Sequence, residues 1–180
     1  MDAIKNITTR SSARELIEPH PSAQEMETVF KAALRAPDHA WLKPSRFIQI
    51  SGNGRNKLSQ IFIKTAHELN KELTETQILK YTEAPFRAPM IIILISNYKE
   101  HPKVPPIEQI ISTGCAGQNI LLALNALGYG GMWRTGTFAF NEVISKHLGL
   151  EKSAQVIGYI YAGTRTGKNK KIPIHDVKDY

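Results

Sequence analysis

The chain of 180 residues is 42% hydrophobic and 22% charged, as expected for one soluble globular domain and not for a disordered chain. Its single cysteine, Cys115, excludes an intrachain disulfide and makes a cysteine-based metal site improbable. The net charge of +7 favours anionic partners, which include phosphorylated cofactors, nucleic acid and acidic membrane surfaces.

The N-terminal residues, the apolar runs and the basic C-terminal residues bear on where the protein resides and what it binds. Residues 1–5 lack the apolar core of a signal peptide, and the longest apolar run, Met90 to Ile95, is too short to cross a bilayer. We therefore expect a cytoplasmic protein with no membrane partner. No nucleic-acid-binding signature is present, so we expect no nucleic-acid partner either. A solvated basic tail is expected to hold Arg165, Lys168, Lys170 and Lys171.

The first chemical signal is Arg10-Ser11-Ser12-Ala13-Arg14, which offers two guanidinium groups, two hydroxyls and turn N–H groups within five residues. This set suits a phosphate dianion, because arginine provides planar multidentate donors and backbone N–H groups add dipoles. An alternative is that the arginines are solvated and that Ser11 or Ser12 only caps a helix.

Helices and strands then alternate. The capping box at residues 22–25 predicts a helix to about Arg35, before Pro37. A strand is expected over 47–50, closed by a turn at 52–54, and a helix over about 56–69.

The central segments are more apolar. Met90 to Ile95 is a β-branched run suited to a doubly covered strand. A long helix over 107–127 is apolar around most of its girth, so we expect it at the centre of the domain or in a dimer interface. Glycines lead from it into residues 132–135. Asn141 is expected to cap a short helix to Leu148, and 154–162 reads as the last strand.

Several familiar motifs are excluded. Gly128-Tyr129-Gly130-Gly131 does not complete a dinucleotide-binding fingerprint, and it follows a helix instead of preceding one. Residues 163–168 have three residues between the glycines where a P-loop needs four. The six histidines show no metal-ligand spacing, so we expect no metal site.

The order of several short motifs resembles the FMN-dependent nitroreductase family, and within it the short NAD(P)H nitroreductases of the YdjA type. The resemblance runs from Met1 to about Thr164. It rests on Arg10–Arg14, on Arg35-Ala36-Pro37-Asp38-His39 with Pro44 and Phe47, on Ala84–Pro89, on Gly114–Asn119 and on Gly130–Gly136.

The resemblance implies a set of FMN contacts. Arg10, Ser11 and Ser12 would bind the phosphate, and Arg35 and His39 would also touch FMN. The segment Trp133-Arg134-Thr135 would meet the flavin from the other subunit. Alternative readings are that Arg35 offsets a helix dipole, that His39 is an exposed loop residue and that Trp133 is core filling.

The resemblance also places NAD(P)H at the end of the long helix. Those residues read equally well as helix packing and a glycine stop. They are Ala123, Leu124, Asn125, Ala126, Leu127 and Gly128.

Four positions depart from the wider family's pattern. Ser11 replaces a second basic residue, and Trp41, Lys43 and Ser45 stand where an Asn, a Gln and a Trp are common. These changes bear on the substrate pocket and the flavin edge more than on FMN binding itself, and Trp41 could narrow the site.

The implied fold is α+β over residues 1–180 as a single domain, with a small, mostly antiparallel sheet flanked by helices. It would form a homodimer with FMN at the interface. The implied activity passes hydride from NAD(P)H to flavin, and then electrons to a nitroaromatic, a quinone or a similar flat small-molecule acceptor, by a ping-pong route without a dedicated catalytic residue. The alternatives are a same-fold flavin enzyme with another reaction and a non-catalytic flavin- or nucleic-acid-binding protein.

Overall fold

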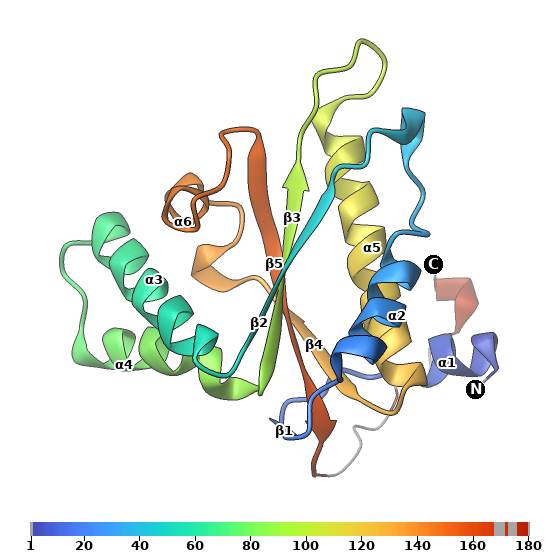
Figure 1. The fold of residues 1–180 in the computed structure, drawn as a ribbon, viewed down its shortest axis with the longest axis horizontal. Coiled ribbons are helices and arrows are strands. Elements are labelled where there is room, and N and C mark those ends of the chain that lie inside the picture. The colour runs from blue at the N-terminus through green and yellow to red at the C-terminus, as the bar shows by residue number, and fades with distance from the viewer. Residues whose placement is uncertain (1, 168–171, 173–175, 180) are drawn as a thin grey trace.

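The structure is a computed structural model that describes residues 2–167, 172 and 176–179. A twisted sheet runs through the middle of the molecule, with a helical layer on each side (Figure 1). The α+β class and the antiparallel sheet expected from the sequence are confirmed.

Every strand pairing in the sheet is antiparallel. The strand order is β1 (Leu16–Ile17), β5 (Ala154–Arg165), β3 (Met90–Asn97) and β2 (Ser45–Ser51), and β4 (Gly130–Arg134) pairs with β5. In β3, residues 90–95 are at most 2% exposed, because helices cover both faces of this strand.

The helices form a layer on each face of the sheet (Figure 1). The first face carries α2 (Ala23–Ala33) and the long α5 (Pro106–Ala126), and the second carries α3 (Gly54–Leu69), α4 (Glu75–Glu83) and α6 (Glu142–His147). Each layer encloses its own apolar cluster. Short 3-10 turns lie at His39–Trp41, Ala84–Arg87, Gly136–Phe138 and Val177–Asp179.

Most expected elements are confirmed with small shifts at their ends. The Ser22–Glu25 capping box starts α2, and the Asn141 side chain caps α6. In a single chain, however, α5 is not buried all round. Ile107 and Ile111 are each 58% exposed, so one stripe of this helix faces away from the sheet.

Four elements were not expected from the sequence: α1 (Ala3–Thr9), β1, α4 and β4. The expectation of a solvated tail is wrong for Arg165, which is half-buried at the end of β5 and donates two hydrogen bonds to Ser11. Lys168, Lys170 and Lys171 lie outside the described residues.

Trp133 on β4 packs where two other elements carry glycine. A Cβ atom at Gly117 of α5 would lie 2.6 Å from the Trp133 ring, and one at Gly158 of β5 would collide with its indole nitrogen. Both glycines therefore make room for the indole, which packs against the apolar cluster under α2 and α5.

This packing predicts the effect of one added methyl group. Gly158→Ala should lower the free energy of unfolding by about 1–3 kcal/mol, because the indole must be displaced from a close-packed site. Urea denaturation measures the change. The double variant Gly158→Ala, Trp133→Leu should recover part of the loss, and a double variant no more stable than Gly158→Ala would contradict this packing.

Candidate active site at strand β4

The N-terminal segment that carries the phosphate signal runs beside the start of β4. The Ala13 N–H donates to the Gly131 carbonyl at 3.1 Å. From the other side, the Arg165 guanidinium donates to the Ser11 hydroxyl at 2.9 Å and to the Ser11 carbonyl at 2.6 Å. The segment is therefore held between β4 and the end of β5 within one chain.

Arg10 follows α1 directly, and its side chain carries an unsatisfied donor. Arg10 Nη1 is buried and has no hydrogen-bond partner among the residues that the structure describes. The alternative that Ser11 or Ser12 caps a helix is wrong, because α1 ends at Thr9 and the next α-helix begins at Ala23. A buried guanidinium N–H without an acceptor is costly, and it favours an anionic ligand at this position.

A second unsatisfied arginine lies at the far end of β4. Arg134 Nε is buried without a partner in the described part of the chain, and the guanidinium carbon lies 5.6 Å from the Tyr161 ring centroid. Burial is the main cause that lowers the pKa of Arg134, and repulsion from Arg87 and Arg14 adds to it. Arg87 and Arg14 are therefore close enough to Arg134 to repel its charge.

Arg87 and Arg134 border a cavity of about 180 Å³ on the α4 side of the sheet. Arg87, Arg134 and Thr135 contribute polar groups to its wall, and Lys80 lies at its edge on α4. Tyr161 lines it too, and burial raises the pKa of this phenol, although Arg87 and Arg134 oppose that shift. The pocket combines aromatic walls with a positive rim, which suits a flat, electron-rich or anionic ligand.

A larger cavity of about 840 Å³ lies elsewhere, between the start of α5, the ends of β3 and β5, and α6. Its wall includes Ser96, whose buried hydroxyl has no partner among the described residues. None of the residues singled out from the sequence lines it. We therefore place the candidate site at β4 and not in the larger cavity.

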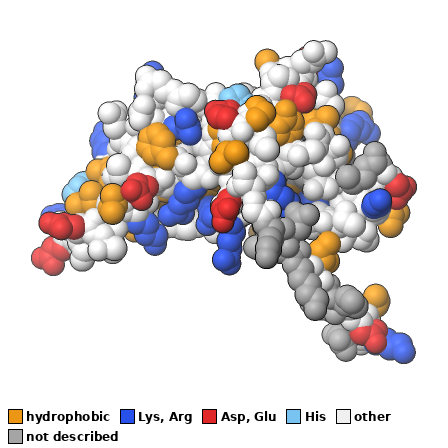
Figure 2. All heavy atoms as spheres, turned by 90° about the horizontal axis from the view of Figure 1, so that it is seen from below, with side chains coloured by type: hydrophobic (Ala, Val, Ile, Leu, Met, Phe, Trp, Pro, Cys, Tyr) orange, Lys and Arg blue, Asp and Glu red, His pale blue; other side chains and the backbone are white. Residues whose placement is uncertain are grey.

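The donors along β4 fit an elongated anion such as FMN. No carboxylate in residues 2–167 forms an ion pair with Arg10, Arg14, Arg87 or Arg134. Gly131, beside Ala13, and Arg134 are three strand residues apart, or about 10 Å. One end can take a phosphate and the other the polar edge of a ring. Figure 2 views the molecule from below and shows Lys and Arg side chains exposed across this face.

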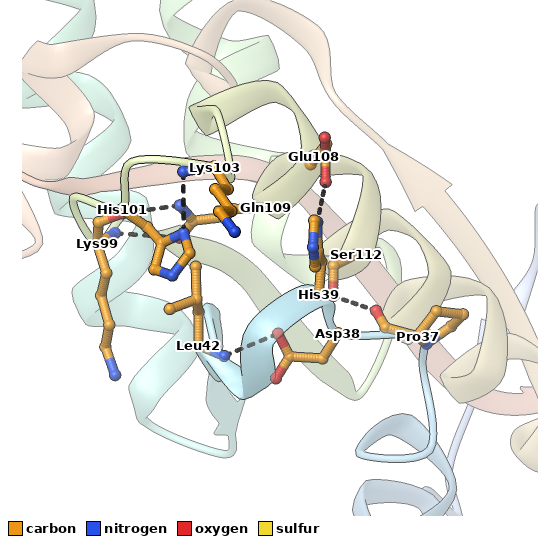
Figure 3. Close-up of polar contacts among 10 residues, drawn as sticks. All are labelled: Pro37, Asp38, His39, Leu42, Lys99, His101, Lys103, Glu108, Gln109 and Ser112. Atoms are coloured by element: carbon orange, nitrogen blue, oxygen red, sulfur yellow. Dashed lines mark hydrogen bonds and ion pairs between the residues drawn. The ribbon is translucent and has the colours of Figure 1, made fainter.

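Arg35 and His39 lie in a different part of the chain. They follow α2, and Pro37 between them reaches the N-terminal half of α5, where the Ser112 hydroxyl donates to the Pro37 carbonyl at 2.6 Å (Figure 3). His39 Nδ1 lies 2.8 Å from a Glu108 carboxylate oxygen. Arg35 and His39 are both exposed. The α1 end of the site instead contacts the other half of α5, through the Asn6 side chain and the Leu122 carbonyl.

The side chains of Trp133 and Arg134 lie on opposite faces of the sheet. Trp133 packs against the cluster under α5, whereas Arg134 lies over Tyr161, which belongs to the opposite cluster. The structure thus supports core filling for most of the Trp133 ring. Thr135 is exposed and lines the smaller cavity.

The residues expected to contact NAD(P)H have packing or capping roles within the chain. Leu124 is fully buried, and the Asn125 amide donates to the Asn6 side chain at 2.6 Å. Gly128 follows the helix with a φ of +88°, as a helix stop requires. Ala123 is half-buried, whereas Ala126 and Leu127 are exposed, as is Gly128. Their contact with NAD(P)H stays a prediction.

The sequence analysis placed Arg14 in the phosphate-binding set, but it did not assign Arg87 or Arg165 to this site. Arg87 lies within Ala84–Pro89, one of the segments on which the family resemblance rests. In the part of the chain that is described, no group of three or more His, Cys, Asp or Glu side chains could hold a metal ion. None of the described helices is long and apolar enough to span a membrane.

Comparison with known proteins identifies relatives over almost the whole chain. The model of the nitroreductase family matches residues 7–164. "Putative NAD(P)H nitroreductase YdjA" of Escherichia coli (strain K12) is 35% identical over 164 residues, which cover 91% of this chain and 88% of that protein. "Putative NAD(P)H nitroreductase" of Haemophilus influenzae is 33% identical over 182 residues, which cover 100% of this chain and 98% of that protein.

Solved structures show the same fold at lower identity. A nitroreductase-like family protein from Bacillus cereus superposes with a TM-score of 0.83 at 20% identity, covering 99% of this chain and 94% of its own. The FMN-dependent nitroreductase NfnB from Mycobacterium smegmatis, solved in complex with NADPH, has a TM-score of 0.75 at 16% identity, covering 98% and 95%.

Proposed function

We propose that this chain, which belongs to the nitroreductase family, is an FMN-dependent NAD(P)H oxidoreductase that reduces nitroaromatics, quinones or similar flat acceptors. The observation that supports the proposal most strongly is the pair of unsatisfied buried arginine donors at the two ends of β4. The names of the relatives agree with it, since they include NAD(P)H nitroreductases and an FMN-dependent nitroreductase.

In this proposal the phosphate of FMN lies at Arg10 and Ser12, with Ser11 held by Arg165. The ring lies in the smaller cavity, where Arg134 and Thr135 face its polar edge. When bound, FMN accepts a hydride from NAD(P)H and returns two electrons to the acceptor. The protein's task is to hold the phosphate, to set positive charge beside the ring and to leave one ring face open.

We propose that the protein is a homodimer formed through the exposed stripe of α5. Ile107 and Ile111 lie on this stripe, and Ile4 of the neighbouring α1 is 68% exposed. Beyond the backbone of its own helix and its chain neighbours, no atom of the described residues lies within 4 Å of the Cβ position at Gly114, so packing within the chain does not require glycine there. A second helix could approach closely at this point.

The arrangement of subunits in the proposed site follows from the single chain. The Ala13 N–H is hydrogen-bonded to the Gly131 carbonyl of the same chain. A flavin whose phosphate lies at residues 10–12 would therefore meet residues 133–135 of the same subunit. Arg35 and His39 would then reach the same flavin from the second subunit, and the assignment of residues 133–135 to the opposite subunit is not retained. NAD(P)H would share the open ring face with the acceptor, near residues 123–128.

The phosphate clamp can be tested by substitution. Arg10→Ala should weaken FMN binding roughly 10- to 100-fold, because a charge-assisted hydrogen bond contributes about 1.5–3 kcal/mol. Ser12→Ala should weaken it less. Lys64→Ala removes a positive charge from exposed α3 and is the control. Titration of apoprotein with FMN gives the affinities, and equal values for Arg10→Ala and Lys64→Ala would remove Arg10 from the site.

The dimer interface can be tested with two exposure-matched variants. Ile111→Arg should give a monomer that loses FMN, since a buried guanidinium would face the partner helix. Leu79 on α4 is 57% exposed, and Leu79→Arg should leave the dimer intact. Size-exclusion chromatography with light scattering measures both. A monomeric wild-type protein with its full complement of FMN would contradict the shared site.

Steady-state kinetics test whether the hydride donor and the electron acceptor use the same face of the flavin ring. Because donor and acceptor stack in turn on one face, they cannot bind together, and steady-state kinetics should be ping-pong with parallel double-reciprocal lines. Intersecting lines would show a ternary complex and contradict the shared face. Flavin binding without any turnover would identify a non-catalytic flavoprotein instead.

A further inference from the structure

The loop at residues 38–43 has an unusual backbone. Three of its residues adopt left-handed φ angles although none is glycine: Ala40 at 57°, Trp41 at 55° and Lys43 at 52°. Side chains with a Cβ rarely adopt this region, and such conformations persist only where the surrounding structure enforces them. They also concentrate at ligand clamps and active sites.

The Asp38 carboxylate enforces the loop. Oδ1 accepts the Leu42 N–H at 3.1 Å, and Oδ2 accepts the Lys43 N–H at 2.8 Å. Both carboxylate oxygens are thus used on the backbone of one turn, as Figure 3 shows for Leu42. The loop is also fixed to α5 by the Ser112 hydroxyl and by the pair of His39 and Glu108.

The result of this enforced turn is the display of Trp41. The Trp41 side chain is 83% exposed, although an indole gains more from burial than most side chains do. The loop lies beside the N-terminal half of α5, next to the exposed Ile107 and Ile111. A second copy of the chain seated on α5 would therefore lie within reach of the indole.

An antiparallel pair of α5 helices would bring the N-terminal half of one helix to the C-terminal half of the other. The C-terminal half of α5 is where α1 and the phosphate segment lie, through the contact of Asn6 with the Leu122 carbonyl. Trp41 of one subunit would then face the flavin site of its partner.

We propose that Asp38 is a positioning residue, whose carboxylate holds the strained 38–43 loop so that Trp41 closes one side of the partner's acceptor pocket and selects acceptors by size. The inference rests on the proposed function, because it needs FMN at β4 and a dimer. Asp38 touches neither the flavin nor the acceptor in this account. It acts through the backbone of Leu42 and Lys43.

The placement of Trp41 can be tested without turnover. Protein labelled with 5-fluorotryptophan contains two fluorines, at Trp41 and Trp133, and Trp41→Phe assigns their ¹⁹F resonances. Adding FMN to wild-type apoprotein should shift the Trp41 resonance, and Asp38→Asn should reduce this shift while FMN still binds. Equal shifts in the two proteins would overturn the role of Asp38.

The same titration separates this inference from the proposed function. If FMN does not bind to wild-type protein, the proposed function fails and the inference fails with it. If FMN binds and the Trp41 resonance does not move, the inference alone is overturned.

Acceptor selection supplies the second readout. Trp41→Ala should change the ratio of kcat/KM for a bulky and a small quinone about two- to tenfold, as expected for loss of one aromatic contact. Asp38→Asn should change it in the same direction. Glycine adopts left-handed angles freely, so adding Ala40→Gly and Lys43→Gly to Asp38→Asn should return the ratio toward the wild-type value.

Phe140 provides a matched control, because it is 54% exposed and has a φ of 59° but lies between the 3-10 turn Gly136–Phe138 and α6. Phe140→Ala should leave the ratio unchanged. An unchanged ratio in Trp41→Ala, or an equal change in Phe140→Ala, would overturn the selection of acceptors by Trp41. Absence of rescue by the glycine pair would overturn the strained-loop explanation.

Discussion

The unsatisfied guanidinium donors along β4 are the constraint that organises this molecule. A buried N–H without an acceptor costs about 1–3 kcal/mol, and Arg10 Nη1 and Arg134 Nε are both buried without a partner among the described residues. The hydrogen bond from Ala13 to Gly131 holds the segment that carries Arg10 beside the strand that carries Arg134. An anion lying along β4 would satisfy both donors at once, so ligand binding and folding of this region reinforce each other.

The two faces of β4 have separate tasks. On the α5 side, Trp133 fills the space left by Gly117 and Gly158. On the other side, Arg134 faces Tyr161 and the cavity. Because successive strand residues alternate in direction, a packing residue and a ligand-facing residue can be adjacent in sequence. Precise packing beneath the strand thus fixes the charged group above it.

Local sequence signals predict much of the fold. The elements that they did not predict depend on pairing between distant parts of the chain. The capping box at Ser22 and the β-branched run from Met90 act within a few residues, so α2 and β3 follow from the sequence. Strand β4 is short and glycine-rich, and it exists because β5 pairs with it. Arg165 resembled a solvated tail residue, and only the return of β5 to Ser11 shows its role. The unsatisfied donors depend on three-dimensional burial, which no sequence pattern reports.

The central claim is that this chain holds a redox-active flavin at β4, and the visible absorption spectrum of the purified protein tests it most directly. After reconstitution with FMN and removal of free cofactor, the protein should retain flavin absorption, and anaerobic NADH or NADPH should bleach it. A protein that retains no flavin after reconstitution, or whose bound flavin neither nucleotide reduces, would contradict the account.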